Sequence, residues 1–401
     1  MTIANEDRTV DWNPFDPSAL ADPHEAFKDA RSRCPVPYSD QLGGFWSLLR
    51  HDDIAAACKD HTTFSSEPQF SVPALDIGFP WLPIQVDPPR HEAYRAVLRP
   101  YLTRTRTSEL MPAMRELARE ILHGFAGRES IDAATEFAHV YAARTLCLAL
   151  DLPADHWRTF RQWAYDITHA SSTNDMALFG SVVEQVFEYV DAEAAARTAA
   201  PGDDLMSSLL ATEIDGRPPT IAELRGYYLL LITAGHDTSA NTLGSVVFHL
   251  AQHPDHRARL RSSPDLVPLA VEEIVRFYPP LVALGRQVAA DTERFGCPMK
   301  RGDQVALVWA SATRDEAHFA DADEFVIDRR PNAHIGFGHG VHHCVGADLA
   351  RVQLRVAMEE LLSAFPDFHI SGPIVRTVWP TNGYRSLPIT FGPGPSGPVA
   401  S

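Results

Sequence analysis

Apolar residues recur at helical spacing over one long stretch, from Thr220 to about His253, where Pro254 ends the pattern. Thr220 and Glu223 have the spacing of a capping box, in which each side chain accepts the other residue's backbone N–H. A helix of roughly 32 residues is about 48 Å long, because each residue adds about 1.5 Å. We therefore expect this helix to cross the whole molecule.

Shorter patterns predict further helices and a few strands. Helical patterns cover residues 23–33, 53–59 and 348–362, and several more lie between 110 and 215, with breaks near Gly127, Pro153, residues 171–175 and Pro201. Residues 45–49 and 305–309 are expected to be strands, and Asn382-Gly383 a hairpin turn. The sequence therefore predicts a mainly α fold with small β sheets.

The segment from residue 64 to residue 86 follows neither period. Its apolar residues, among them Phe79, Trp81 and Leu82, are interrupted by Pro68, Pro73, Pro80 and Pro83. Such a segment is typical of a loop that closes over an apolar ligand. A loop that packs on the core has the same composition, and the residues alone favour neither interpretation.

Length and charge narrow the class of protein. The chain has 401 residues, 45% of them hydrophobic, and a net charge of −17. Two or three domains are usual at this length. No stretch has the composition of a linker, however, so we expect one domain over residues 1–401 with a polar leader of about 13 residues. The negative charge argues against nucleic acid as a partner.

Cysteine usage and the N-terminus indicate the compartment. Five cysteines are far apart and odd in number, which suits a reducing environment and argues against a disulfide framework. They are Cys34, Cys58, Cys147, Cys297 and Cys344. The first residues lack a signal-peptide core, and the longest apolar run is too short to span a bilayer. We expect a cytoplasmic monomer that does not bind membranes.

The middle of the long helix contains residues that a plain helix would avoid. Gly235 costs roughly 1 kcal/mol relative to Ala in a helix interior. Asp237 and Thr238 cost more when buried, unless their hydrogen bonds are satisfied. Strain at such a place is more often functional than accidental. The alternative is a simple helix bend in which Thr238 bonds back to a carbonyl.

A second unusual segment ends at Cys344. Gly336, Gly338 and Gly340 precede it, so the backbone can bend and approach a flat group closely. A helical pattern starts just after Cys344, which would place the thiol at a helix N-terminus, where a thiolate is favoured. A single thiolate without a cysteine partner indicates an axial metal ligand.

Two other interpretations of Cys344 exist. It could be a buried core cysteine after a glycine turn. It could also bind zinc together with His339, His342 and His343. Tight zinc sites usually have paired ligands such as CxxC with a distant second pair, and this sequence has none.

Residues 337–346 resemble the haem-binding signature of the cytochrome P-450 family. Phe337, Gly340, Cys344 and Gly346 match it, and His342 stands where that family has Arg or His. Three further motifs follow the order of the family: Asp87-Pro88-Pro89 with His91 and Arg95, Ala234-Gly235 with Asp237-Thr238, and Glu273 with Arg276. The resemblance extends from about residue 14 to residue 391.

The resemblance implies the cytochrome P-450 fold, with haem b between the long helix and the cysteine loop. Cys344 would be the axial iron ligand, and His91, Arg95, Arg286 and His342 would bind the haem propionates. Further haem contacts would come from Phe337, Gly338, Gly346, Ala234 and Gly235. Glu273, Arg276 and Arg329 would form the structural triad of the family. Residues 281–284 would be the strand that passes over the haem.

The implied activity is monooxygenation. One oxygen atom of O2 would enter a C–H bond of a small hydrophobic substrate, terpenoid or aromatic-like, with Asp237 and Thr238 delivering protons. Electrons would come from NAD(P)H through a separate ferredoxin reductase and ferredoxin, because no reductase domain is fused. The residues expected to line the substrate pocket are Phe79, Trp81, Leu82, Leu231, Ala234, Val282, Leu284 and Thr381.

Two other functions compete with this one. A peroxide-driven peroxygenase would need no redox partner, but such family members usually replace the acid–Thr pair. A haem-thiolate sensor without turnover would not need Asp237 and Thr238 either. The chain keeps both residues, so the monooxygenase is the favoured interpretation.

Overall fold

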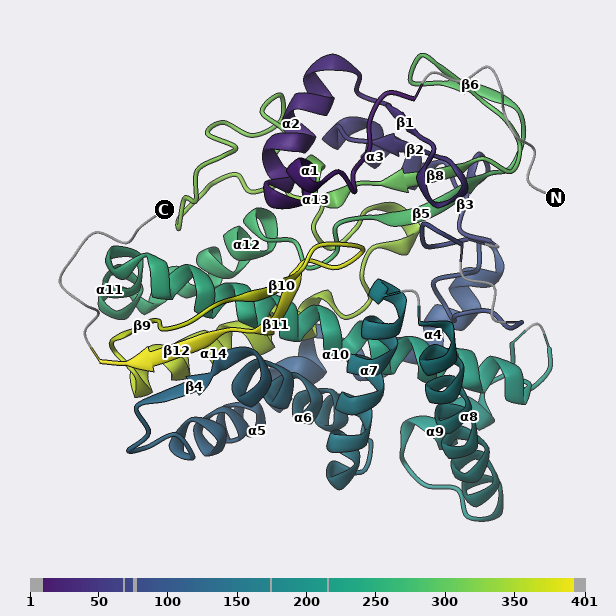
Figure 1. Ribbon diagram of the computed structural model, residues 1–401. Coiled ribbons are helices and arrows are strands. Elements are labelled where there is room, and N and C mark those ends of the chain that lie inside the picture. Colours follow the sequence, from purple (N-terminus) through teal and green to yellow (C-terminus); the bar gives the residue numbers. More distant parts are fainter. Residues whose placement is uncertain (1–9, 68, 75–77, 174, 215, 393–401) are drawn as a thin grey trace.

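One buried helix, α10 (Ile221–Gln252), organises the fold (Figure 1). The computed structural model describes residues 10–67, 69–74, 78–173, 175–214 and 216–392. The predicted capping box is confirmed, since Thr220 and Glu223 each accept the other's backbone N–H. Pro254 begins the next helix, α11 (Pro254–Ser262), and so ends α10 where the sequence predicted.

Several helices pack around α10, which is apolar on most sides, as a helix in a core must be. α6 (His139–Ala149), α7 (Trp157–Thr173), α8 (Met176–Ala199) and a π-helical turn at Ala133–Ala138 contact it directly. α14 (Ala347–Ala364) lies along α5 (Arg104–His123) and also reaches α10. Their buried apolar side chains form one continuous cluster, which is the main core.

A five-stranded sheet lies at the other side of the molecule, under α2 (Pro23–Arg33) and α3 (His51–Lys59) (Figure 1). Its order is β1 (Tyr38–Ser39), β2 (Phe45–Leu48), β8 (Gln304–Leu307), β5 (Leu284–Val288) and β3 (Phe64–Ser65). β2 and β8 are parallel, and the other pairs are antiparallel. Two smaller apolar clusters join this sheet to the helices beside it.

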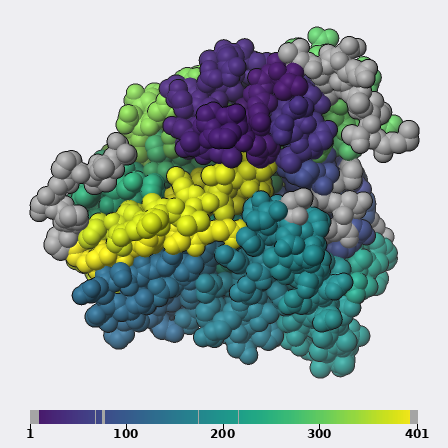
Figure 2. All heavy atoms as spheres, in the orientation of Figure 1, coloured from purple at the N-terminus to yellow at the C-terminus, as the bar shows by residue number. Residues whose placement is uncertain are grey.

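Three small sheets and five shorter helices complete the elements used below. β10 (Val375–Thr377) pairs with β11 (Gly383–Ser386), and β6 (Thr292–Arg294) with β7 (Cys297–Met299). β12 (Pro388–Phe391) lies between β4 (Ser130–Asp132) and β9 (Phe368–Ile370). The helices are α1 (Pro17–Ala21), α4 (Arg90–Leu102), α9 (Leu205–Ala211), α12 (Val267–Phe277) and α13 (Trp309–Ala312). The C-terminal strands form part of the surface between the N-terminal segment and α5 to α7 (Figure 2).

Most predicted elements are confirmed, with ends that differ by one or two residues. α2 has the predicted bounds, α3 begins at His51, and α14 covers the pattern predicted for 348–362. The strand predicted for 305–309 ends at Leu307, because the Val308 carbonyl accepts the N–H groups of Ser311 and Ala312 and so starts α13.

Two predictions around the C-terminal hairpin are wrong in detail. The strand predicted at 281–284 begins only at Leu284, because the preceding residues bond to a loop: the Val282 N–H donates to Pro380 O at 2.9 Å. The hairpin itself exists, but Gly383 is already in β11 opposite Thr377. Asn382 donates its N–H to Pro280 O at 2.8 Å, so it connects two segments and does not form the turn.

No helix in the described part of the chain combines the length and the apolar character that a membrane span requires. The organisation of residues 1–401 as one domain stays a prediction. Residues 1–9 of the predicted polar leader lie outside the described residues.

Candidate active site

The loop that carries Cys344 is held by its own backbone and by α3. The Cys344 N–H donates to Phe337 O at 2.8 Å, and α14 starts at Ala347, just beyond. Gly338 and Gly340 have φ of 74° and 68°, a region that glycine enters without strain. A Cβ on Gly340 would lie 2.3 Å from Cys58 O of α3, so only glycine permits this contact.

The thiol of Cys344 has exposed surface although protein atoms surround it, as expected for a side chain that lines an internal space. Burial raises the pKa of Cys344, and the Gly346 N–H and the charges of Arg95 and Arg351 oppose this increase only in part. The N–H group at the start of the helix therefore favours the thiolate, as expected, but it does not outweigh the burial of the thiol. A cation bound to the sulfur would have to supply the rest.

One face of α10 is open in its middle, although the helix is otherwise buried. Ala234 is exposed, and Leu231, Gly235 and Thr238 are partly exposed. The Thr238 hydroxyl donates to Ala234 O at 2.8 Å, which is the back-bond considered as the alternative from sequence. A Cβ on Gly235 would lie 2.6 Å from a methyl group of Leu146, so a larger residue here would have to displace that side chain of α6.

Asp237 points to a different side of α10 and is buried. Its Oδ2 accepts a hydrogen bond from Asn241 Nδ2 at 3.0 Å, and it lines a small polar cavity with Tyr165, His139 and Arg385. Burial raises the pKa of Asp237 to about 6, against the charge of Arg385 and the Asn241 hydrogen bond. This carboxyl can therefore bind and release a proton near neutral pH.

Four basic side chains gather between the cysteine loop, α4 and β5. His91 and Arg286 are only 2% and 3% exposed, and the His91 and His342 rings lie 4.3 Å apart. His342 Nε2 lies 3.1 Å from Ser66 Oγ and 3.7 Å from Asp87 Oδ1. Burial, together with the charges of His342 and Arg95, lowers the pKa of His91 to about 4.

This group has more donors than acceptors. Among the described residues, Arg286 donates a hydrogen bond to the Gly285 carbonyl at 2.6 Å, and His91 Nδ1 has no partner. Buried cations are stable when they are paired with anions. The donors therefore suit a ligand with carboxylates, which can accept several charge-assisted hydrogen bonds at once.

Comparison with known proteins decides the family. Residues 159–267 and 265–371 match the sequence profile of the family Cytochrome P450. A methyl-branched lipid omega-hydroxylase of Mycobacterium tuberculosis is 33% identical over 394 residues, which cover 91% of this chain and 90% of that protein. The chain belongs to the cytochrome P450 family.

Other P450s give the same result. The linalool 8-monooxygenase of Pseudomonas putida is 32% identical, with 87% of this chain and 90% of that protein covered. A solved structure of a mutant of P450 EryK in complex with erythromycin B has a TM-score of 0.84 at 30% identity, over 95% of this chain and 98% of that chain. The protein is thus a P450 monooxygenase with the P450 fold, and the family's cofactor is haem. The donors around His91 and Arg286 fit the carboxylates of that group.

The three residues of the predicted triad come together in this P450. Glu273 and Arg276 are fully buried, with Arg276 Nε 2.8 Å from Glu273 Oε2 and Nη2 2.7 Å from Oε1. Arg329 Nε lies 3.1 Å from Glu273 Oε1. The neighbouring Glu272, which sequence reasoning missed, accepts hydrogen bonds from Arg351, and the Arg351 guanidinium lies over the Phe337 ring.

The predicted substrate pocket is only partly supported. Leu231, Ala234 and Leu284 have open surface, and Phe79 lies against Phe187 of α8. Leu82 is fully buried close to Gly226 of α10, Trp81 packs against Phe70, and Val282 belongs to the cluster of Trp12 and Phe27. These three are core residues, which for Trp81 and Leu82 is the alternative that the loop composition left open. Thr381 is 8% exposed and forms an isolated bridge with Leu281.

Sequence reasoning missed the environment of Asp237. His139 and Arg385 lie about 100 and 150 positions from Asp237 in the chain, and no local pattern connects them. His236, to which we assign no role, is fully buried with Nε2 3.2 Å from His139 O. The spacing of Asp237 and Asn241, four residues apart on one helix, was the available signal.

The pKa of Asp237 gives a prediction about stability. It is about 6 in the folded protein and about 3.9 in the unfolded chain, so this contribution to stability is present at acidic pH and is lost as the pH rises through 6. Asp237→Asn removes the ionisation. It should raise the free energy of unfolding by roughly 3 kcal/mol at pH 8, at about 1.4 kcal/mol per pKa unit, and change it little below pH 4.

Urea unfolding of the haem-loaded protein at pH 8 and at the lowest pH where it stays folded measures this difference. The exposed Asp265→Asn serves as control and should show no such pH dependence. An equal effect of Asp237→Asn at both pH values would contradict the raised pKa.

Proposed function

We propose that Cys344 is the axial thiolate ligand of the haem iron in this P450. The observation that carries the proposal is the placement of one cysteine, on a glycine-bent loop, beside four basic side chains, of which Arg286 donates to a neutral carbonyl and His91 Nδ1 has no hydrogen-bond partner among the described residues. His91, Arg95, Arg286 and His342 would bind the propionates. When bound, the haem supplies dioxygen binding and the transfer of one oxygen atom to a C–H bond.

The reduced protein with carbon monoxide should show the red-shifted Soret band of thiolate ligation. Cys344→His should lose this band and the monooxygenase activity, because imidazole donates less charge to iron than a thiolate does. Cys297→Ala, which changes a cysteine at β7, is the control and should keep both. A Cys344→His protein that retains the red-shifted band would exclude this residue as the ligand.

Proton supply is assigned to Asp237 and Thr238. Asp237 titrates near neutral pH and lines a polar cavity with Arg385 and Tyr165, which supports proton uptake from that side. Thr238 uses its hydroxyl hydrogen for Ala234 O, and its oxygen remains free to accept a hydrogen bond from a group on the open face of α10. This acid and hydroxyl would together hold and move protons on the side of α10 that faces the haem when it is bound.

Electrons are proposed to come from NAD(P)H through ferredoxin reductase and ferredoxin, in the cytoplasm. Arg99 follows Arg95 by one turn of α4 and is exposed, as is Arg104 at the start of α5. The charge of Arg95, one turn earlier, also opposes the rise in the pKa of Cys344. Positive charge on this side of an acidic protein would attract an acidic carrier, and salt would weaken the attraction.

Thr238→Ala tests proton supply and electron supply together. With NADH and a reconstituted ferredoxin pair, the variant should still consume NADH, but product per NADH should fall about tenfold or more while peroxide rises, since a positioned proton donor contributes roughly 10²–10⁴-fold. Thr233→Ala removes the same type of back-bond, to Leu229 O, and is the matched control.

Unchanged product per NADH in Thr238→Ala would refute its role in proton supply. Wild-type protein that forms product with peroxide but not with NADH and ferredoxin would favour the peroxygenase. Absence of product with either would favour the sensor.

The substrate is proposed to be compact and hydrophobic, of the terpenoid kind. Leu231 and Ala234 present apolar surface on the open side of α10, and Leu284 of β5 is partly exposed. Relatives with matching chemistry in their names are the linalool 8-monooxygenase and Cytochrome P450-terp. Other relatives act on a methyl-branched lipid or on erythromycin, so the family alone leaves the class open.

Linalool and pseudoionone should therefore shift the haem spectrum from low spin to high spin at lower concentration than erythromycin B does. The measurement is a spectral titration of the same preparation with each compound, with myristic acid as a straight-chain fatty acid control. A shift at lower concentration with erythromycin B or with myristic acid would contradict the terpenoid class.

A further inference from the structure

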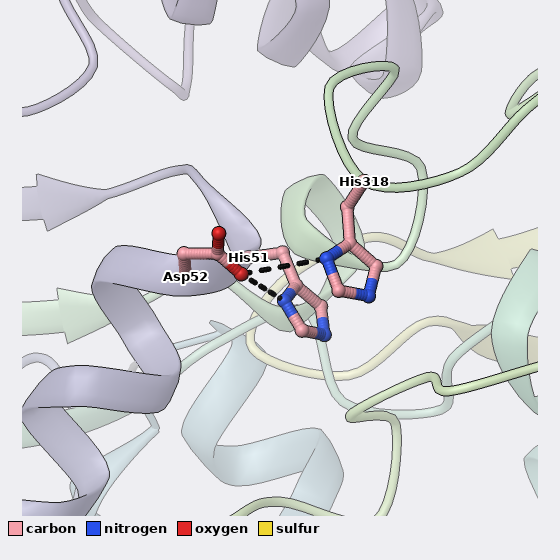
Figure 3. Close-up of side chains that lie close together, drawn as sticks. All are labelled: His51, Asp52 and His318. Atoms are coloured by element: carbon pink, nitrogen blue, oxygen red, sulfur yellow. Dashed lines mark hydrogen bonds and ion pairs between the residues drawn. The ribbon is translucent and has the colours of Figure 1, made fainter.

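Two imidazoles and one carboxylate meet at the start of α3, outside the active site (Figure 3). His51 and Asp52 are the first two residues of α3, and His318 comes from the segment after α13. Asp52 Oδ1 lies 2.9 Å from His51 Nδ1 and 3.4 Å from His318 Nδ1. The ligand atoms of the three residues all lie within 4.8 Å of one another.

Both ring nitrogens of His51 face oxygen atoms that only accept hydrogen bonds. Nε2 lies 3.2 Å from Ala333 O, and Nδ1 lies 2.9 Å from Asp52 Oδ1. The neutral ring has one hydrogen for these two acceptors. A metal ion between Nδ1 and the carboxylate would leave that hydrogen on Nε2, where it can donate to the carbonyl. A backbone carbonyl on the far nitrogen is also what orients metal-binding histidines.

The His51 and His318 rings are stacked, with centroids 3.3 Å apart at 20°. Their Nδ1 atoms both lie near the same Asp52 oxygen, at 2.9 and 3.4 Å. A single divalent ion would bind both nitrogens and this carboxylate.

The surrounding charges favour a cation as well. Asp53 and Asp315 lie near the cluster, and Asp315 Oδ2 accepts the backbone N–H of His51 at 2.9 Å. Arg50 is the cation near Asp53. The negative charge of Asp52, Asp53 and Asp315 is larger than the positive charge of Arg50. It also opposes the positive end of the α3 dipole.

We propose that His51, Asp52 and His318 bind a divalent transition-metal ion of the zinc type. Two imidazoles and one carboxylate are a common zinc donor set, and water would complete the tetrahedron. Access is open, since the Asp52 side chain is 87% exposed. The His318 ring has to tilt until its lone pair converges with that of His51, and of the bonds in the described residues only the one to Asp52 holds this ring.

The ion would join two segments that both support the cysteine loop. α3 contacts Gly340 through Cys58. The second segment, residues 313–324, carries His318. Its carbonyls of Thr313, Ala322 and Glu324 accept hydrogen bonds from Arg276, which is paired with Glu273. Binding should therefore stabilise the folded protein without entering the oxidation reaction.

The test uses chelator-treated, haem-loaded protein without a histidine tag, titrated with Zn²⁺ in equilibrium dialysis. We expect saturable binding of one Zn²⁺ per chain and a higher melting temperature, because a ligand that binds only the folded state stabilises it. His318→Gln and Asp52→Asn should each weaken binding at least about tenfold, given that loss of an outer partner alone costs 10–100-fold. Asp52 is so exposed that its variant should fold normally.

His256→Gln is the matched control. His256 lies 2.9 Å from His249 in a second group of histidines and should leave the Zn²⁺ affinity unchanged. Loss of binding in His256→Gln but not in His318→Gln would overturn the proposal, and so would wild-type protein that binds no Zn²⁺ saturably. The reduced carbon monoxide spectrum of each variant verifies that the active site is intact.

Discussion

A fully buried ion pair, Glu273 with Arg276, holds the part of the molecule that carries Cys344. Charges in a protein interior are tolerated only when they are paired and their hydrogen bonds are complete. Arg276 donates to carbonyls between Thr313 and Glu324, and Glu273 accepts from Arg329 and Asn332. The segment that leads to the cysteine loop is thus tied to α12, and removal of either partner would cost about 3–5 kcal/mol through the charge left behind.

The two faces of the active site obey opposite requirements. On the cysteine side, the Glu273 carboxylate and the Arg276 guanidinium are each held by several hydrogen bonds. On the α10 side, Asp237 is buried with a pKa of about 6, which means that its ionised form destabilises the fold at neutral pH. Such a cost persists in a protein when function needs the group in that state. The contrast supports a structural role for the first cluster and a chemical role for the second.

Sequence alone could predict what depends on neighbours in the chain. The capping box at Thr220 and Glu223, the bounds of α2 and the glycines at Gly338 and Gly340 are local features with a local physical cause. What failed depends on segments far away. Asn382-Gly383 does not form the turn because Asn382 bonds to Pro280, and Leu82 is core because Gly226 lets the loop approach α10. His139 and Arg385 join Asp237 only after folding, so no spacing could reveal them.

The position of Cys344 is set mainly by backbone contacts, and this explains why α3 matters to a site that it does not enter. Gly340 fits against Cys58 O, and the Cys344 N–H is held by Phe337 O. Backbone contacts of this kind have no rotamers, so they pass a shift of the helix directly to the sulfur atom. The opposite end of α3 carries His51, whose Nε2 bonds to Ala333 at the entrance of the same loop. A metal ion at His51 would therefore stabilise α3 and the entrance of the cysteine loop together. It would do so from outside the active site.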